Sequence, residues 1–170
     1  IPKTGVFGLY DLIGIDLMVD VLKSFIKELP QSDPFHIVAK EIPLVKQLIE
    51  NGYTGRKGKG GFYRMNKSNN QKFLEAINLE SGEYSKVKKI DLGIDTVDLK
   101  NLINRKDKYG EYAWSVISKI IKYASSLVPG ITDKFNDIDE AMRLGFNWAM
   151  GPFEMLKEIG VENFFNRIDE

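Results

Sequence analysis

The chain has 170 residues, of which 43% are hydrophobic and 28% charged, as is usual for a globular protein. Lys plus Arg and Asp plus Glu each number 24, and this zero net charge argues against a general nucleic-acid binder. The absence of cysteine excludes a disulfide framework and a thiolate metal site, and it fits the cytoplasm. No apolar run approaches the roughly 20 residues that span a bilayer, and the first residues resemble neither a signal peptide nor a natural start, which suggests an excised fragment.

The first part of the chain is expected to be helical. Apolar residues at three- and four-residue steps predict a helix that follows Asp16, a candidate N-cap, and ends at Pro30. Pro43 suits the first position of a second helix, and Gly52 is the expected stop. Residues 62–90 contain short runs typical of strands between turn-forming residues, so we expect a small β-meander there, inserted between two helical units.

The second half again predicts helices. The clearest covers residues 112–128, with one apolar face, and Pro129 follows it. A short helix is expected from Asp137, which has Glu140 three residues on, to Gly145. Another helix is expected to open at Pro152 and to end at Gly160.

Two segments of the chain repeat each other. Residues 4–16 align with residues 150–162, and identical residues pair Gly5 with Gly151, Phe7 with Phe153, Ile13 with Ile159 and Gly14 with Gly160. We expect the first Gly to permit a tight entry, the Phe to fill a core site, and the later Gly to end the helix with positive φ. The acid that follows, Asp16 or Glu162, is expected to cap the next helix. These roles are architectural, and the first copy lacks the two helices that precede Gly151.

Two stretches then carry a resemblance to a known family. Residues 137–145, followed by Met150-Gly151-Pro152-Phe153-Glu154, closely resemble the C-terminal domain of the 3-hydroxyacyl-CoA dehydrogenases. Residues 42–57, followed by Gly60-Gly61-Phe62-Tyr63, resemble the end of that family's first repeat. The motif residues are Gly5, Phe7, Gly14, Asp16, Gly61, Phe62, Tyr63, Gly145, Gly151, Pro152, Phe153 and Gly160. With its insertion, the chain is most similar to the long, multifunctional bacterial members, which also carry an enoyl-CoA hydratase domain.

The resemblance implies a mainly α fold with two helical repeats and a small β insertion. The expected division is 1–65 for the second half of the first repeat, 66–105 for the insertion and 106–170 for the second repeat. The implied parent activity is NAD-dependent oxidation of an L-3-hydroxyacyl-CoA in fatty-acid β-oxidation. The family's catalytic His and Glu and its NAD site lie on an N-terminal Rossmann domain, and a further Asn lies on the first helix of the first repeat. None of these segments is in this sequence, so we expect the fragment alone to be inactive.

The resemblance implies that this fragment forms one wall of the acyl-CoA cleft and an interface between repeats or between subunits. An interface between subunits would make the parent enzyme a homo-oligomer. The alternative from another class is a non-catalytic helical interaction module of a multienzyme complex. Residues immediately before Ile1 would separate the two, since a Rossmann fingerprint there would support the enzyme.

The Gly-rich, basic loop of residues 52–61 is the one candidate binding site. It fits neither the P-loop nor the dinucleotide spacing. Arg56, Lys57 and Lys59 could meet the phosphates of coenzyme A, although a solvated turn before a strand is the commoner meaning of such a loop. Many family members place a small polar residue and then Gly after the Lys of this loop, and the run Lys57-Gly58-Lys59-Gly60-Gly61 departs from that pattern.

Other polar and aromatic residues favour structural roles. Asp11, Asp16 and Asp20 are close in sequence, but carboxylates so spaced on helices are usually caps or solvated faces, so no metal is expected. His36 lies outside the family motifs and is expected in a surface loop. Most aromatic residues are expected in the core, and some would line the path of an acyl tail if one touches this chain.

Overall fold

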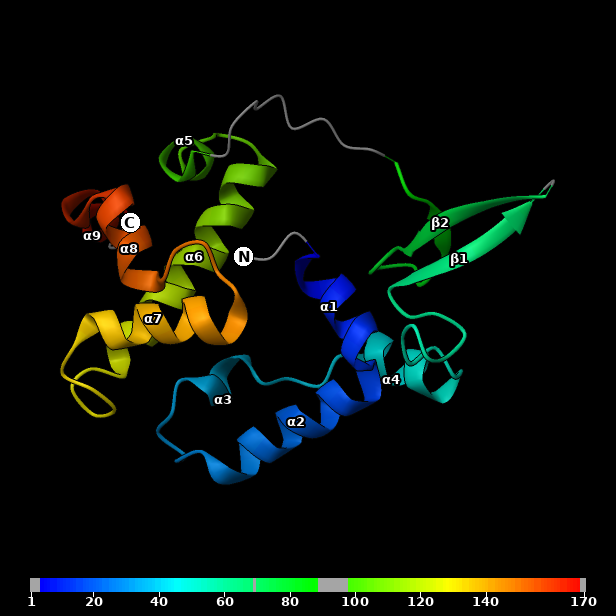
Figure 1. Ribbon diagram of the computed structural model, residues 1–170, viewed down its shortest axis with the longest axis horizontal. Coiled ribbons are helices and arrows are strands. Elements are labelled where there is room, and N and C mark those ends of the chain that lie inside the picture. The colour runs from blue at the N-terminus through cyan, green and yellow to red at the C-terminus, as the bar shows by residue number, and fades with distance from the viewer. Residues whose placement is uncertain (1–3, 69, 89–97, 169–170) are drawn as a thin grey trace. The chain divides into compact units, whose positions relative to one another are not determined.

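Figure 1 shows the computed structural model, which describes residues 4–68, 70–88 and 98–168. The described residues are mainly helical and include one three-stranded antiparallel sheet, which confirms the expected fold class. They form two compact units, one with the described residues up to 88 and the other with residues 98–168. No helix in the described ranges is both long and apolar enough to cross a membrane.

The first unit begins with four helices: α1 (Gly5–Ile13), α2 (Ile15–Glu28), α3 (Phe35–Val38) and α4 (Pro43–Glu50). Pro43 opens α4, and Gly52 follows that helix with a φ of 79°, as expected from the sequence. The core of this unit lies where α2, α4 and the sheet meet. Its buried members are Ile15, Val45, Leu48, Phe62 and Ile77.

The sheet of the first unit has the order β1 (Tyr63–Ser68), β2 (Gln71–Ile77) and β3 (Tyr84–Lys86). Tyr63 pairs with Ala76 in β2, and Ile77 pairs with Tyr84 in β3, both antiparallel. The β-meander expected in this part of the chain is therefore confirmed over residues 63–86. The last two positions of the expected meander, 89 and 90, lie outside the described residues.

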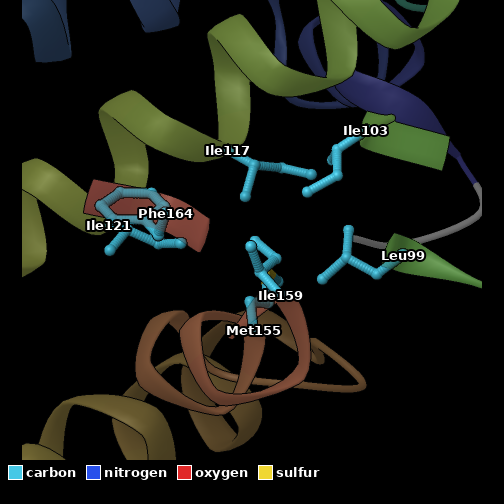
Figure 2. Packing of buried hydrophobic residues seen from close by; sticks show 7 residues of the cluster. All are labelled: Leu99, Ile103, Ile117, Ile121, Met155, Ile159 and Phe164. Atoms are coloured by element: carbon cyan, nitrogen blue, oxygen red, sulfur yellow. The ribbon is translucent and has the colours of Figure 1, made fainter. Parts of the chain in front are cut away.

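The second unit contains α5 (Leu99–Ile103), α6 (Lys108–Ser126), α7 (Phe135–Phe146), α8 (Pro152–Ile159) and α9 (Val161–Ile168). Figure 2 shows that side chains from α5, α6, α8 and α9 converge on one cluster. Burial of these apolar side chains drives the packing of the unit, because each contributes roughly 1.5–3 kcal/mol when removed from water. The cluster consists of Leu99, Ile103, Ile117, Ile121, Met155, Ile159 and Phe164.

The two copies of the repeated segment adopt the same helix–glycine–helix path. Gly14 ends α1 with φ 117° and ψ 124°, and Gly160 ends α8 with φ 92° and ψ 121°. Each glycine N–H donates to a carbonyl four residues back, at 2.9 Å for Gly14 and 3.0 Å for Gly160. The expected positive φ at both glycines is confirmed, and only glycine adopts it without steric cost.

Several expected helix ends were wrong. Asp16 is not the N-cap of α2, because α2 already begins at Ile15 and Gly14 occupies the cap position. The helix expected over residues 112–128 begins at Lys108, where the Asp107 carboxylate accepts hydrogen bonds from two backbone N–H groups. α7 begins before Asp137 and continues through Gly145 to Phe146, where Asn147 in the left-handed conformation ends it. In α6 the helix start is fixed by a side-chain cap that apolar periodicity does not reveal.

A buried aspartate holds the first unit together. Asp11, on α1, is 3% exposed, and its two carboxylate oxygens accept hydrogen bonds from the backbone N–H groups of Phe62 and Tyr63, each at 2.8 Å. A Cβ at Gly61 would overlap Asp11 Oδ1, so this close approach requires glycine. Burial raises the pKa of the Asp11 carboxyl, while the two N–H donors and the charge of Arg56 oppose that rise. The start of β1 is thereby fixed to α1.

A buried aspartate also holds the second unit together. Asp139, on α7, is also 3% exposed, and its carboxylate accepts a hydrogen bond from the Phe153 N–H at 2.8 Å. A Cβ at Gly151 would overlap Asp139. Arg143, one turn along α7, forms an ion pair with Glu154, which also accepts from the Gly151 N–H at 2.8 Å. α7 therefore holds the N-terminus of α8.

The glycines at the start of the two repeated helices have different backbone conformations. Gly5 has a φ of 70°, whereas Gly151 has a φ of −78°. Phe7 was expected in the core but is 38% exposed, although its ring lies 4.6 Å from that of Phe62. Phe153 is only half-buried, against the ring of Phe135 at 4.7 Å, so the expected core position of both Phe residues is wrong.

Replacement of Asp11 by Ala should destabilise the first unit by about 2–4 kcal/mol, because two backbone N–H groups lose a charged acceptor. Gly61→Ala should destabilise it as well, since the new methyl group displaces the carboxylate. Urea unfolding monitored by circular dichroism measures both changes. Asp20→Ala is the control, because that carboxylate is exposed on α2, and a loss as large as that of Asp11→Ala would contradict the proposed role.

Asp107 should make the second unit sensitive to acid. The Arg105 guanidinium, which donates to the carboxylate at 2.9 Å, together with the N–H donors of α6, lowers the pKa of Asp107 to about 2. A depressed folded-state pKa stabilises the fold above the unfolded value near 3.8, and this stabilisation is lost as pH falls toward 2. Asp107→Ala should therefore lower the melting temperature at pH 7, and the difference from wild type should shrink steadily between pH 5 and pH 2. A difference that does not depend on pH would show that the charge of Asp107 is unimportant.

Candidate functional site

The Gly-rich loop of residues 52–61 is a tightly bonded turn. The Gly55 N–H donates to the Gly60 carbonyl at 2.7 Å, and the Gly58 N–H donates back to the Gly55 carbonyl at 3.0 Å. Arg56 N–H donates to the Asp11 carbonyl at 2.7 Å, and Lys59 N–H donates to the Gly52 carbonyl at 3.3 Å. A Cβ at Gly55 would overlap the backbone of Asp11, so the loop lies directly against α1.

This bonding decides what the loop can bind. A phosphate-binding loop presents free backbone N–H groups to the anion. Here the N–H groups of Gly55, Arg56, Gly58, Lys59 and Gly61 all donate to carbonyls within the protein. The backbone N–H groups of these five residues are therefore engaged, which favours binding of an anion through the side chains of the loop.

The three cations expected to bind coenzyme A lie on this one loop but differ in availability. The Lys59 ammonium donates to the Asn51 carbonyl at 3.2 Å, at the C-terminal end of α4, where the helix dipole favours a positive charge. Arg56 and Lys57 are exposed. The loop thus offers Arg56 and Lys57 to an anion, with Lys59 turned toward the helix.

A cluster next to the loop was not identified from the sequence. The Arg64 guanidinium donates to Glu75 at 2.7 Å across β1 and β2, and it lies over the Tyr84 ring at 3.9 Å from the centroid. Tyr84 hydroxyl donates to the Gly61 carbonyl, and the Tyr53 ring lies 5.7 Å from that of Tyr84. Burial is the largest cause that raises the pKa of Tyr84 to about 12, so this hydroxyl remains a hydrogen-bond donor at neutral pH. The cluster therefore fixes the last residue of the loop, Gly61, to the sheet.

The second unit has an open pocket beside its core. Arg167 closes one side, because its guanidinium donates to the Ile103 carbonyl at 2.6 Å and lies 4.3 Å from the Trp114 ring centroid. Three amide side chains give the pocket a polar rim without a free carboxylate or a histidine. The lining residues are Ile103, Asn104, Trp114, Ile159, Asn163, Asn166 and Arg167.

The remaining candidates from the sequence do not form a site. In the described ranges, no three His, Asp or Glu side chains gather closely enough to hold a metal ion. Asp11 serves the loop, whereas Asp16 and Asp20 are exposed on α2. The ring Nε2 of His36 lies 3.0 Å from the Pro30 carbonyl and ties α3 to the turn after α2.

Comparison with curated proteins finds relatives over almost the whole chain. It is 42% identical over 92% of its length to a Rickettsia felis protein and 41% identical over 99% to a Rickettsia prowazekii protein, both named as fatty acid oxidation complex trifunctional enzymes. It is 27% identical over 99% of its length to a Bacillus subtilis protein named as a 3-hydroxyacyl-CoA dehydrogenase. The chain spans only 21%, 23% and 22% of the length of these three relatives.

A family model gives the same result. The model of the 3-hydroxyacyl-CoA dehydrogenase C-terminal domain matches residues 2–65 and 112–167, which is more than half of the chain. No solved structure shows a significant match. The two matched stretches are those that carry the repeated helix–glycine–helix segments and the two buried aspartates. The chain therefore belongs to the family of the 3-hydroxyacyl-CoA dehydrogenase C-terminal domain.

Proposed function

We propose that the chain is the C-terminal helical part of an NAD-dependent L-3-hydroxyacyl-CoA dehydrogenase of fatty-acid β-oxidation. In that enzyme it forms one wall of the acyl-CoA cleft and an interface between repeats or subunits, while hydride transfer to NAD takes place on another domain. The proposal includes a cytoplasmic location and the division into 1–65, 66–105 and 106–170. The observation that carries it is the family match on both sides of the insertion.

The Gly-rich loop supplies the proposed contact with coenzyme A. Arg56 and Lys57 are exposed cations on a turn whose backbone is fixed by Asp11 and by its own hydrogen bonds. A rigid turn loses little entropy when it meets a ligand, which favours binding by even two side chains. Their charges are suited to the phosphates of coenzyme A, in charge-assisted hydrogen bonds.

The described residues do not fit a nicotinamide dinucleotide. A dinucleotide fingerprint needs a Gly-rich turn between a strand and the N-terminus of a helix. This loop follows α4 and leads into β1, and five of its N–H groups, those of Gly55, Arg56, Gly58, Lys59 and Gly61, donate within the protein. NAD is therefore assigned to the Rossmann domain of the proposed parent enzyme, and no step of the reaction is assigned to this chain.

The isolated chain should produce no NADH from a 3-hydroxyacyl-CoA and NAD, because its described residues present neither a dinucleotide site nor a histidine base in a cleft. The assay is absorbance at the NADH band, with an intact 3-hydroxyacyl-CoA dehydrogenase as the positive control. Turnover above the blank that persists after repeated purification would contradict the proposed division of labour.

Coenzyme A binding tests the loop directly. Arg56→Glu/Lys57→Glu should weaken the binding of coenzyme A by about tenfold or more, because two attractive charges become repulsive. The reference is Lys119→Glu combined with Lys122→Glu, which reverses two exposed charges on α6. Isothermal titration at low and at moderate salt measures all three proteins.

The control separates a site from a general charge effect. Both double variants change the net charge equally, so equal losses of affinity would mean that coenzyme A senses only the overall field. Unchanged affinity in Arg56→Glu/Lys57→Glu would remove the loop from the proposed cleft.

A further inference from the structure

The second unit contains a half-buried arginine that has no counter-ion among the described residues. Arg64, Arg105 and Arg143 each form an ion pair with a carboxylate, and Arg56 is exposed to water. Arg167 is half-buried, and in the described part of the chain it forms no ion pair. A cation that is partly removed from water attracts an anion more strongly than one in open solvent.

Two contacts hold the Arg167 guanidinium in place. Its Nη1 group donates to the Ile103 carbonyl at 2.6 Å, and its central carbon lies 4.3 Å from the ring centroid of Trp114. A guanidinium has five N–H donors, and within the described residues only the Ile103 carbonyl accepts from them. The remaining donors are therefore held in a fixed position, so an anion binds there without first ordering a long side chain.

This guanidinium lines the open pocket beside the core of the second unit. The pocket has a volume of about 290 Å³, at the low end for a ligand pocket, which suits a small molecule. Ile103 and Ile159, two of the buried side chains drawn in Figure 2, line its apolar part together with Trp114. A ligand that combines a charged group with a short apolar chain would match both parts of the pocket.

Three carboxamides complete the polar part of the pocket. The Asn163 Nδ2 group donates to the Ile159 carbonyl at 3.3 Å, whereas the side chains of Asn104 and Asn166 make no hydrogen bond within the described chain. An amide N–H donates to an anion without adding a charge of its own. The described lining residues include no Asp or Glu, so no side chain in the pocket repels an anion.

The helix ends around the pocket limit the charge of the ligand. Asn104 is the C-cap of α5, and Arg167 lies in the last turn of α9. The carbonyl end of a helix carries a partial charge of about −0.5, which offsets part of the charge of Arg167. The pocket therefore suits a monoanion better than a phosphate with two charges. The planar fork of a guanidinium also matches the two oxygens of a carboxylate.

We infer that this pocket binds a small monocarboxylate with a short apolar chain, of the size of butyrate. The carboxylate oxygens accept hydrogen bonds from Arg167 and from the amide groups of Asn104 and Asn166. The alkyl chain lies against Ile159 and Trp114. The site lies within the second unit, and it neither rests on the coenzyme A contact proposed for the first unit nor involves NAD.

The probe is butyrate, which is titrated into the full chain at low salt and followed by NMR. The Trp114 indole N–H and the side-chain amides of Asn104 and Asn166 should shift together, with a dissociation constant of about 1–10 mM, as expected for so small a ligand. Methyl butyrate lacks the charge, acetate lacks the apolar chain, and inorganic phosphate carries a higher charge. Each of these three should bind at least about fivefold more weakly than butyrate.

Asn166→Asp tests the charge of the site without removing Arg167. The new carboxylate lies in the same pocket as the guanidinium and competes with the ligand, so butyrate should bind about tenfold more weakly. Asn136→Asp is the matched control, because Asn136 is exposed on α7 outside the pocket, and it should leave the affinity unchanged. Arg167→Gln should also weaken binding by about tenfold or more. It removes the contacts with Ile103 and Trp114 as well, so Asn166→Asp decides if that variant unfolds.

Several results would overturn the inference. A Trp114 indole N–H that does not shift up to about 50 mM butyrate would show that the pocket does not take a carboxylate. Equal affinity for methyl butyrate would make the apolar part alone responsible, and equal affinity for phosphate would make the pocket a general anion site. Equal losses in Asn166→Asp and Asn136→Asp would mean that butyrate senses only the overall field.

A last variant tests whether the chain supplies the anion itself. Binding that appears only after Asp169→Asn/Glu170→Gln would mean that an acid of the chain, and not a ligand, meets Arg167, and it would also overturn the inference. Butyrate should instead bind this variant and the unaltered chain equally. A failure to bind coenzyme A would refute the contact proposed for the Gly-rich loop and leave these measurements unaffected.

Discussion

Both units depend on a buried aspartate on a helix. Its carboxylate accepts hydrogen bonds from backbone N–H groups, and a glycine allows the close approach. A carboxylate out of water is costly unless donors surround it, and Asp11 and Asp139 meet this need with N–H groups of Phe62, Tyr63 and Phe153. Gly61 and Gly151 permit the approach, since a Cβ at either would overlap the aspartate. In the first unit this interaction fixes the Gly-rich loop and β1 on α1, and in the second it fixes α8 on α7.

The proposed coenzyme A contact follows from that constraint. Because the N–H groups of Gly55, Arg56, Gly58, Lys59 and Gly61 donate within the protein, the contact is proposed for the side chains of the loop. The family match places this loop in a chain that spans about a fifth of the length of its relatives.

Local signals made part of the fold predictable. Pro43 and Pro152 mark helix starts, and Gly14 and Gly160 mark stops, because proline and glycine restrict or relax the backbone at their own positions. The role of Asp11 could not be predicted, because its donor Phe62 lies 51 positions away and nothing local distinguishes a buried carboxylate from a solvated one. Asp16 was misinterpreted for a local reason, because α2 begins one residue before it and Gly14 holds the cap position. The Arg64–Tyr84 cluster likewise depends on strand register.

The central claim, that Asp11 anchors the loop and β1 to α1, is tested most directly by amide hydrogen exchange measured residue by residue by NMR. The account predicts that the Phe62 and Tyr63 N–H groups exchange as slowly as the N–H of buried Ile77 at the end of β2, because each opens only when the unit unfolds. It also predicts that Asp11→Asn accelerates the exchange of these two amides relative to that of Ile77. Fast exchange of Phe62 and Tyr63 in the unaltered chain, with Ile77 protected, would contradict the account, because the loop would then open independently of the core.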